Sequence, residues 1–382
     1  MTVLFSGIFW LSLLFCLGTY VFYPVVIWIV GVLRPLHVNK AAVTPFVSVI
    51  IPAFNEAKHI QKKIENTLNV DYPKECMEIL VGSDGSTDDT ALIMQEYVSE
   101  TVRFFDFTEN RGKTAVQNDL VKYARGDILI FTDAASFEDS ASFKAIVNNF
   151  NDKRVGCVAG CMHFLDTETN LTTQSQGLYW KYESKIREFE SRIGSLIGVD
   201  GPLYAVKPEY YVPLEYHMIS DLLTPLLVLE KGGKVVFESA AQVYEEPTVK
   251  TVQEYTTRRR ITLRGLVGLR NHGYLLHPLK HPFLSFQILF HKVVRWGVGL
   301  LWGLNILSCV VLASQPVFLF LLGLHCLVIA LALLGWGAST KGSGYRILTV
   351  PYYFSLVNLA ATMGIVDFFR KKQAVAWKPV RE

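Results

Sequence analysis

The chain carries little net charge. Of its 382 residues, 37 are Lys or Arg and 34 are Asp or Glu, so the formal net charge is only +3. Proteins that bind nucleic acid usually show a strong basic excess, and this balance indicates no nucleic-acid partner. Charged residues make up 19% of the chain, whereas hydrophobic residues make up 51%. A hydrophobic fraction this high is unusual for a soluble enzyme.

Charge is missing altogether from some segments. Residues 5–33 contain no charged side chain, and the run exceeds the ~20 residues that cross a bilayer. We predict a signal anchor, because no basic residues precede the run and it is too long for a cleaved signal peptide. Residues 296–312 and 316–336 predict a transmembrane hairpin. Residues 347–369 are interrupted by Asp367, and we expect a re-entrant or interfacial segment there.

These apolar segments predict three parts: an N-terminal anchor over residues 1–40, a globular domain over 41–282, and a C-terminal membrane region over 283–382. Arg34 and Lys40 follow the first run, and basic residues favour the cytoplasmic side of a membrane. We therefore expect a multi-pass protein of the cell membrane with its globular domain in the cytoplasm.

Several familiar motifs are absent. The six cysteines include no CxxC pair, and Cys157 and Cys161 have no further Cys or His at intervals typical of zinc sites. We expect reduced, buried thiols. The chain also contains no GxGxxG and no P-loop, so neither a dinucleotide cofactor nor an NTPase is indicated.

What the middle of the chain does contain is an alternation of strands and helices. Apolar runs predict strands at 46–51, 77–84, 102–107 and 127–133, and a helical pattern follows each of the first three. Strand–helix alternation with short connections predicts an α/β domain with a mostly parallel sheet of nucleotide-binding type. Ligands of such sheets bind at the carboxyl ends of the strands.

Polar residues stand at those strand ends. Asn55 follows the first strand, Asp84 ends the second, and Asp133 follows the fourth. We expect Asn55 to cap the next helix, and a capping box from Ser86 to Asp89 to open the helix after the second strand. Carboxylates at these positions can accept hydrogen bonds from a base or a ribose.

Longer blocks carry a family resemblance. "VSVIIPAFNEAKHIQKKIENTL", "YPKECMEILVGSDGSTDDT", "RGKTAVQND", "ILIFTDAAS" and "YEEPTVKTVQEYTTRRRITLRG" follow one another between about residues 46 and 270. They resemble successive blocks of glycosyltransferase family 2, in the membrane-bound branch similar to cellulose synthase and poly-N-acetylglucosamine synthase. The closing residues 376–382, "AWKPVRE", are similar to the tail of many such enzymes.

The resemblance implies a GT-A fold, flanked here by N- and C-terminal transmembrane helices. It also implies a nucleotide-diphosphate sugar donor and transfer with inversion at the anomeric carbon. The positions that match the family's nucleotide-sugar-binding residues are Pro52, Ala53, Asn55, Glu56, Asp84, Lys113, Asp133, Ala134, Arg258, Arg259 and Arg260. Arg111 lies beside Lys113 in the same loop.

The metal motif is reduced. Asp133 matches the first aspartate of the family's DxD-type motif, but Ala135 replaces the usual second ligand. Mg²⁺ keeps several waters and takes ligands from substrate phosphates. The resemblance therefore implies a weak, donor-assisted Mg²⁺ or Mn²⁺ site at Asp133. Ser136, Glu138 and Glu245 remain open as further ligands.

The catalytic base of the family matches Asp221. The acidic residue that usually precedes it is Ser220 in this chain. An alternative is that Asp221 only stabilises a helix N-terminus, in which case Glu183 or Asp200 would be the base. Close to Asp200, Gly201 would permit a close approach of the backbone.

The predicted function is that of a membrane-anchored, inverting hexosyltransferase. It transfers a sugar from the nucleotide donor to a lipid-linked or membrane-proximal glycan acceptor, in contact with membrane lipid. A processive polysaccharide synthase is one alternative, although the Gln-x-x-Arg-Trp motif of processive members is absent near Arg258. A non-catalytic nucleotide-sugar-binding scaffold is another, favoured by Ala135 and Ser220.

Overall fold

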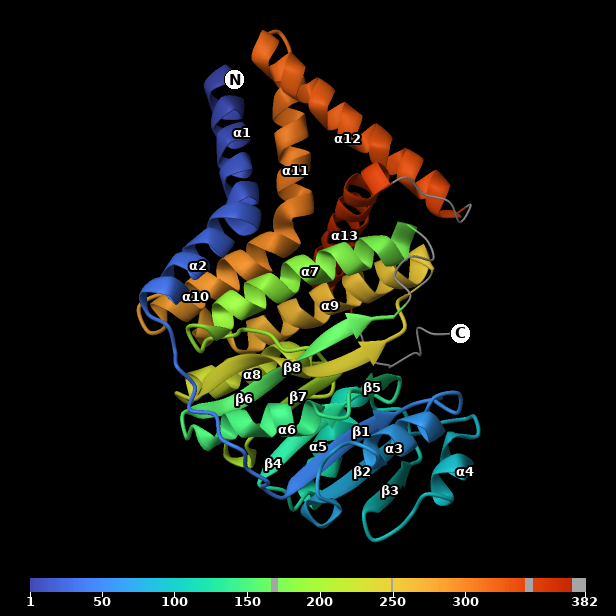
Figure 1. Cartoon of the computed structure of the whole chain (residues 1–382). Coiled ribbons are helices and arrows are strands. Elements are labelled where there is room, and N and C mark those ends of the chain that lie inside the picture. Colours follow the sequence, from blue (N-terminus) through green and yellow to red (C-terminus); the bar gives the residue numbers. More distant parts are fainter. Residues whose placement is uncertain (166–170, 249, 341–345, 373–382) are drawn as a thin grey trace. The chain divides into compact units, whose positions relative to one another are not determined.

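The computed structural model describes residues 1–165, 171–248, 250–340 and 346–372 (Figure 1). The closing residues 376–382 lie outside this range. The chain divides into two compact units. The sheet unit comprises Val30–Leu165 and Ser184–Glu246, and the membrane unit comprises the described residues of Met1–Ile29, Asp166–Glu183 and Pro247–Lys372. The expected boundaries at residues 40 and 282 stay predictions.

The sheet unit is built on one eight-stranded sheet with the strand order β3-β2-β1-β4-β7-β6-β8-β5. Strands β1 to β4 pair in parallel, β7 is antiparallel to β4 and β6, β6 and β8 are parallel, and β5 is antiparallel to β8. The predicted α/β class with a mostly parallel sheet is confirmed. The strands are β1 (Val47–Ala53), β2 (Met77–Asp84), β3 (Val102–Phe107), β4 (Ile128–Thr132), β5 (Ser136–Glu138), β6 (Val155–Phe164), β7 (Leu203–Val206) and β8 (Lys234–Glu245).

Helices cover both faces of this sheet. Every residue of β1, β2 and β4 is buried, which is why their sequences read as continuous apolar runs rather than alternating patterns. Helix α5 packs against β1 and β2, and α6 packs against β6 and β8. The helices of the sheet unit are α3 (Ile60–Leu68), α4 (Thr90–Gln95), α5 (Lys113–Tyr123), α6 (Ser142–Val147) and α8 (Ser220–Glu230).

Two predicted helix starts are wrong. Helix α3 begins at Ile60 rather than after Asn55, and α4 begins at Thr90 without a capping box from Ser86. Asn55 adopts a left-handed backbone with φ 53°, and its Oδ1 accepts a hydrogen bond from the backbone N–H of Thr87 at 2.8 Å. The polar residues expected to cap helices instead tie the two loops to each other.

A buried ion pair lies beneath the end of β4. Lys63 of α3 contacts Glu138 of β5, and both side chains are fully buried. The Lys63 ammonium also donates hydrogen bonds to Thr132 Oγ1 and to the Ser136 carbonyl, each at 2.7 Å. Burial lowers the pKa of Lys63, while the Glu138 carboxylate acts to raise it. Lys63 thereby connects both ends of the turn between β4 and β5.

The membrane unit consists of helices. Among the described residues, four helices that lie wholly or partly in this unit are long and apolar enough to cross a membrane: Thr2–Leu33, Pro282–Val311, Pro316–Ser339 and Ile347–Phe369. Its helices are α1 (Thr2–Leu17), α9 (Thr251–Asn271), α10 (Pro282–Ile288), α11 (Val294–Val311), α12 (Pro316–Thr340) and α13 (Arg346–Phe369), while α2 (Tyr23–Leu33) and α7 (Leu171–Ser191) each run from one unit into the other.

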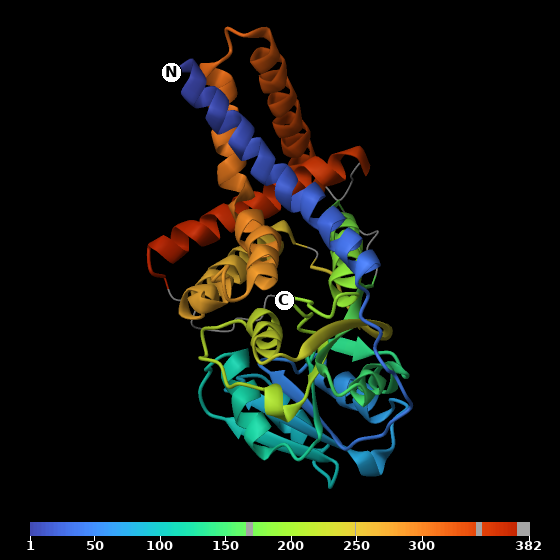
Figure 2. The same cartoon turned by 90° about the vertical axis from the view of Figure 1, so that its left-hand side faces the viewer.

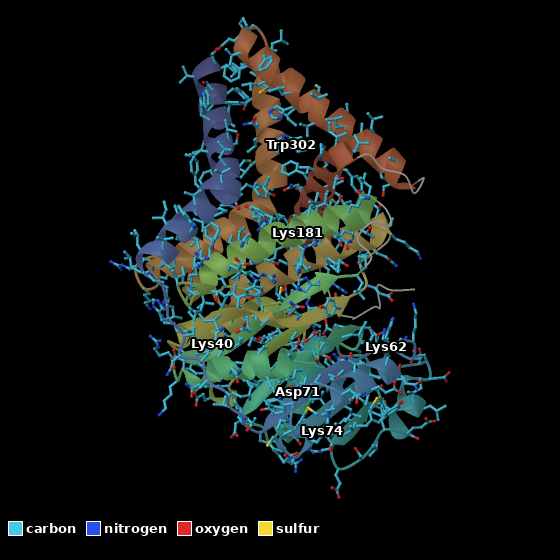
Figure 3. The ribbon with its side chains drawn as sticks, viewed as in Figure 1. Lys40, Lys62, Asp71, Lys74, Lys181 and Trp302 are labelled. Carbon is cyan, nitrogen blue, oxygen red and sulfur yellow. The ribbon has the colours of Figure 1, made fainter. Side chains whose placement is uncertain are left out.

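Polar side chains connect the apolar helices of this unit. Trp302 of α11, labelled in Figure 3, donates a hydrogen bond to His325 of α12 at 3.0 Å. His325 lies 3.0 Å from Asn305 Oδ1, and Asn305 Nδ2 donates to the Phe9 carbonyl of α1. The network joins α1, α11 and α12. Helix α13 runs crosswise to α1 and α12 in Figure 2. The re-entrant or interfacial segment expected at 347–369 stays a prediction, since Ile347–Phe369 is also long and apolar enough to cross a membrane.

Stability should depend on the pair beneath β4. Lys63→Met leaves the Glu138 carboxylate buried without its partner, and we expect a loss of ~3–5 kcal/mol in the free energy of unfolding. The neighbouring Lys62 is exposed, lies 4.3 Å from the Phe137 ring centre and is labelled in Figure 3. Lys62→Met is the control and should cost less than ~1 kcal/mol. Equal denaturant midpoints for the two variants would contradict this account.

Candidate active site

Asp133 lies in a tight turn at the carboxyl end of β4. The turn is closed by Ser136, whose backbone N–H and hydroxyl both donate to the Asp133 carbonyl, at 3.2 and 3.0 Å. Antiparallel pairing of β5 with β8 sets Ser136 opposite Glu245. Glu138 is held by Lys63. Of the three open candidates for a further metal ligand, Glu138 is therefore already engaged by a cation.

The first residue of α5 provides the partner of Asp133. Lys113 Nζ lies 2.6 Å from Asp133 Oδ1, with the two side chains 17% and 28% exposed. Burial acts to lower the pKa of Lys113, but the carboxylates of Asp133, Asp221 and Glu245 outweigh it and raise that pKa above its ordinary value. The ammonium group therefore stays charged in the physiological pH range.

Asp221 is the second residue of α8, where an acidic side chain is favoured by the helix dipole. Its Oδ1 accepts a 3.3 Å hydrogen bond from the Ser220 hydroxyl. The hydroxyl of Tyr204 on β7 is buried nearby, and burial together with the Asp221 carboxylate raises the pKa of Tyr204. Ser220, which replaces an acidic residue of the family pattern, thus lies between two polar groups.

Gly201 lies just before β7, and its lack of a side chain lets other groups approach the backbone closely, as expected. A Cβ atom at this position would lie 2.9 Å from Asp221 Oδ2 and 3.0 Å from Lys113 Nζ. Both functional groups are therefore packed against the backbone at 201. Four residues that are far apart in the sequence, Lys113, Asp133, Gly201 and Asp221, meet at one place in the sheet unit.

Asp84 fixes the backbone that leads into α5. Its two carboxylate oxygens accept hydrogen bonds from the backbone N–H groups of Arg111 at 2.9 Å and Gly112 at 2.7 Å. Burial raises the pKa of Asp84, and these two hydrogen bonds act in the opposite direction. Gly112 has φ 94°, a conformation that favours glycine. The side chain expected to contact a nucleobase is fully buried and holds this loop.

The loop after β1 is tied to the loop after β2. The backbone N–H of Glu56 donates to Thr90 Oγ1 at 2.8 Å, and that of Asn55 donates to Ser86 Oγ at 3.1 Å. The Glu56 carboxylate itself contacts His59. Pro52, Ala53 and Ala134 are buried where β1 and β4 end. These residues, expected to surround a nucleotide, therefore all lie at the carboxyl edge of the parallel strands.

The predicted arginines belong to the membrane unit. They lie on α9, where Arg258 contacts Glu254 at 2.7 Å and Tyr353 at 2.9 Å. Arg259 forms an ion pair with Asp367 of α13 at 2.5 Å, and Arg260 also has a partner. Arg258 and Arg259 thus already join α9 to α13 within this unit.

The alternative bases are engaged by cations. Asp200 contacts Arg187 in the sheet unit, with both side chains buried. Glu183, in the membrane unit, contacts Arg295 at 2.8 Å and lies 3.0 Å from His291. A carboxylate that balances a buried guanidinium is a poor proton acceptor, so neither Asp200 nor Glu183 is well placed to act as the base.

The carboxylates around Lys113 are too few to bind a hard divalent cation without additional oxygen ligands. Asp133 and Asp221 offer oxygen ligands of the kind that Mg²⁺ and Mn²⁺ prefer, but the side chains of Ala134 and Ala135 have no donor atom. Among the described residues, no group of three or more His, Cys, Asp or Glu side chains could hold a metal ion. A cation held at Asp133 therefore needs oxygens from a bound substrate or from water.

Comparisons with known proteins agree with this fold. Residues 48–202 match the family described as glycosyl transferase family 2. A dolichyl N-acetyl-alpha-D-glucosaminyl phosphate 3-beta-D-2,3-diacetamido-2,3-dideoxy-beta-D-glucuronosyltransferase of Methanococcus voltae is 35% identical over 28% of this chain and 34% of its own length. The poly-beta-1,6-N-acetyl-D-glucosamine synthase of Staphylococcus epidermidis is 28% identical over 36% and 37%. The chain thus spans about a third of the length of these two relatives.

A solved structure is similar over most of the chain. The mannosyltransferase PcManGT from Pyrobaculum calidifontis, in complex with GDP-Man and Mn²⁺, has a TM-score of 0.73 at 18% identity. The match covers 96% of this chain and 100% of that one. The predicted GT-A fold is confirmed.

Two residues of this region were not found by sequence reasoning. Lys63 is the second lysine of a polar stretch in α3, and its neighbour Lys62 is exposed. Only helical periodicity, which sets Lys63 on the face with Ile60, Ile64 and Thr67, could have indicated its burial. Tyr204 lies in a short apolar strand, where an aromatic residue is ordinary, so no sequence signal distinguishes it.

Gly201 offers a test of this geometry. Gly201→Ala should displace the side-chain ends of Lys113 and Asp221 by up to ~1 Å. Misplacement of catalytic groups on this scale lowers the reaction rate by up to ~10²-fold. The melting temperature should change little, because the ends of flexible side chains can move aside. Gly273→Ala is the control, since a Cβ there meets nothing within 4 Å. Unchanged activity of Gly201→Ala toward any substrate the protein proves to use would contradict the assignment.

Proposed function

Because residues 48–202 match glycosyl transferase family 2, we propose that the chain is a membrane-anchored, inverting glycosyltransferase. Its donor is a nucleotide-diphosphate sugar. Its acceptor is a lipid-linked or membrane-proximal glycan. The observation that carries the proposal is the position of Lys113 Nζ, 2.6 Å from Asp133 and beside Asp221. The same cation is thus close to two carboxylates, to which we assign different tasks.

The two carboxylates define two sides of the site. Asp133, Asp84 and the loop of Asn55 and Glu56 lie at the carboxyl ends of β1, β2 and β4, where ligands of parallel sheets bind. We assign this side to the nucleotide and its diphosphate. Asp221 lies on α8, where its carboxylate and Lys113 Nζ both pack against the backbone at Gly201, and we assign it to the acceptor.

In the reaction, Asp221 accepts the proton of the acceptor hydroxyl. The acceptor oxygen then forms a bond to the anomeric carbon on the face opposite the diphosphate. The bond between that carbon and the diphosphate oxygen breaks, and its electron pair leaves with the nucleoside diphosphate. Lys113, at the N-terminus of α5, stabilises the negative charge that develops on this leaving group.

We propose that a divalent cation takes part in the reaction and binds mainly when the nucleotide-sugar donor supplies ligands. Asp133 would hold Mg²⁺ or Mn²⁺ with the help of substrate oxygens, and the cation would supply positive charge to offset the charge of the leaving diphosphate. Support comes from the carboxylate of Asp133, and from the similar mannosyltransferase fold that was solved with Mn²⁺. The chain supplies few ligands of its own, so we expect weak binding of the cation in the absence of a donor.

The acceptor is proposed from the membrane unit. Four helices that are long and apolar enough to cross a membrane belong wholly or in part to this unit, and one relative is described as acting on a dolichyl-linked sugar phosphate. We propose a multi-pass protein of the cell membrane whose sheet unit faces the cytoplasm. The pairing of Arg258 and Arg259 with Glu254 and Asp367 favours single transfer over processive synthesis, because these arginines already stabilise the helices.

Release of nucleoside diphosphate tests the proposed activity. Purified full-length protein should slowly hydrolyse one nucleotide sugar when no acceptor is present. The same donor should raise the melting temperature of the protein, since a ligand at 100 times its Kd adds ~2.7 kcal/mol to the free energy of unfolding. The same assay is repeated with Mg²⁺ or Mn²⁺ and with membrane extract as a source of acceptor. If the protein binds a nucleotide sugar but never releases nucleoside diphosphate, it is a non-catalytic scaffold instead.

The roles of the two sides predict opposite kinetic effects. Asp221→Asn should lower transfer by ~10²–10⁴-fold and leave donor affinity nearly unchanged, because an amide cannot take the proton. Asp84→Asn should weaken donor binding first, because the amide NH₂ cannot accept the backbone hydrogen bonds that hold the loop before Lys113.

Asp139→Asn is the matched control. Asp139 precedes α6 and accepts a 3.0 Å hydrogen bond from the backbone N–H of Ala141, so its carboxylate holds a turn just before that helix. Its replacement should cost ~1 kcal/mol of stability or less and leave transfer intact. If Asp221→Asn behaved like Asp139→Asn, the assignment of Asp221 as the base would be wrong.

A further inference from the structure

The same ammonium group faces two requirements that conflict. As a ligand of the diphosphate, Lys113 must reach a substrate oxygen. In the structure, however, its Nζ is bonded to Asp133 Oδ1 at 2.6 Å, on the carboxylate that a divalent cation would need. An ammonium and a divalent cation cannot share one carboxylate oxygen without strong repulsion between them.

We propose that Lys113 is the counter-cation of Asp133 in the donor-free protein, and that binding of a diphosphate transfers its ammonium to the diphosphate and frees Asp133 for a divalent cation. This inference rests on the proposed function. It makes Lys113 the group that couples binding of the cation to binding of the donor, so that the cation site forms only when the donor is present.

The surroundings of Lys113 allow this exchange. Its backbone is fixed, because Asp84 holds the N–H groups of Arg111 and Gly112 immediately before it. Its side chain is a four-carbon stem with freely rotating bonds, and 17% of it is exposed. Only the stem has to move. The N-terminus of the eleven-residue helix α5 adds a second attraction for an anion beside it.

The charges around Lys113 set the direction of the effect. One ammonium faces the carboxyl groups of Asp133, Asp221 and Glu245, and Asp84 lies behind the loop with both oxygens taken by backbone N–H groups. Removing the ammonium uncovers Asp133 and makes the site more negative. Neutral variants of Lys113 should therefore bind a divalent cation more tightly, which is the opposite of what a purely structural or purely donor-binding lysine predicts.

The test measures Mn²⁺ binding by the donor-free, full-length protein in detergent, using the electron paramagnetic resonance signal of free Mn²⁺. Wild type should bind weakly. Lys113→Met should lower the Kd for Mn²⁺ by about tenfold or more, and Lys113→Gln repeats the measurement if the Met variant does not fold. Lys113→Arg keeps the charge and should bind as weakly as wild type.

Two controls locate the effect. Asp133→Asn combined with Lys113→Met should abolish the tighter binding. Lys144 forms an exposed pair with Asp71 at the same 2.6 Å distance, and Lys144→Met should leave Mn²⁺ binding unchanged. The Kd for UDP or GDP should rise in Lys113→Met, because the diphosphate loses its ammonium partner.

Unchanged or weaker Mn²⁺ binding by a folded neutral variant overturns the inference, as does tighter binding that persists without Asp133. The proposed function has its own test in the release of nucleoside diphosphate by wild type. Suppose that wild type releases nucleoside diphosphate but Lys113→Met binds Mn²⁺ no more tightly than wild type. That result would reject the proposed exchange of partners and leave the proposed function standing.

Discussion

The ammonium group of Lys113 and the carboxylate of Asp133 lie 2.6 Å apart at the carboxyl edge of the sheet, and the Asp221 carboxylate is close enough to act on the same lysine. This contact brings together the end of β4, the start of α5 and the start of α8. It also explains why Gly201 has no side chain, since a Cβ there would strike both Lys113 and Asp221. The chemistry we propose for donor and acceptor depends on this one shared cation.

Other residues of the sheet unit fix the backbone on both sides of the Lys113–Asp133 contact. Asp84 anchors the backbone before α5 through Arg111 and Gly112, so the base of Lys113 does not move. Lys63 braces the turn that carries Asp133 through Thr132 and the Ser136 carbonyl. A flexible lysine head on a fixed backbone, opposite a carboxylate on a fixed turn, is suited to change partners without rearrangement of the fold.

The sequence predicted those features that depend on local pattern. The buried strands could be read from their apolar runs, because both faces of a central parallel strand are covered. The strand-end residues Asp84 and Asp133 followed from the same reasoning. Helix starts failed at Asn55 and Ser86, because each side chain bonds to the opposite loop rather than to its own helix. The pairing of Lys113 with Asp133, and the burial of Lys63, depend on residues distant in sequence that no spacing rule connects.

A structure of the full-length protein with a bound nucleoside diphosphate and Mn²⁺ tests the central claim most directly. If Lys113 changes partners as proposed, a diphosphate oxygen will lie within hydrogen-bonding distance of Lys113 Nζ, the ammonium will have withdrawn from Asp133, and Mn²⁺ will lie between Asp133 and the diphosphate. A nucleoside diphosphate bound away from Lys113, or a Lys113–Asp133 ion pair that persists at 2.6 Å beside the bound diphosphate, would contradict it.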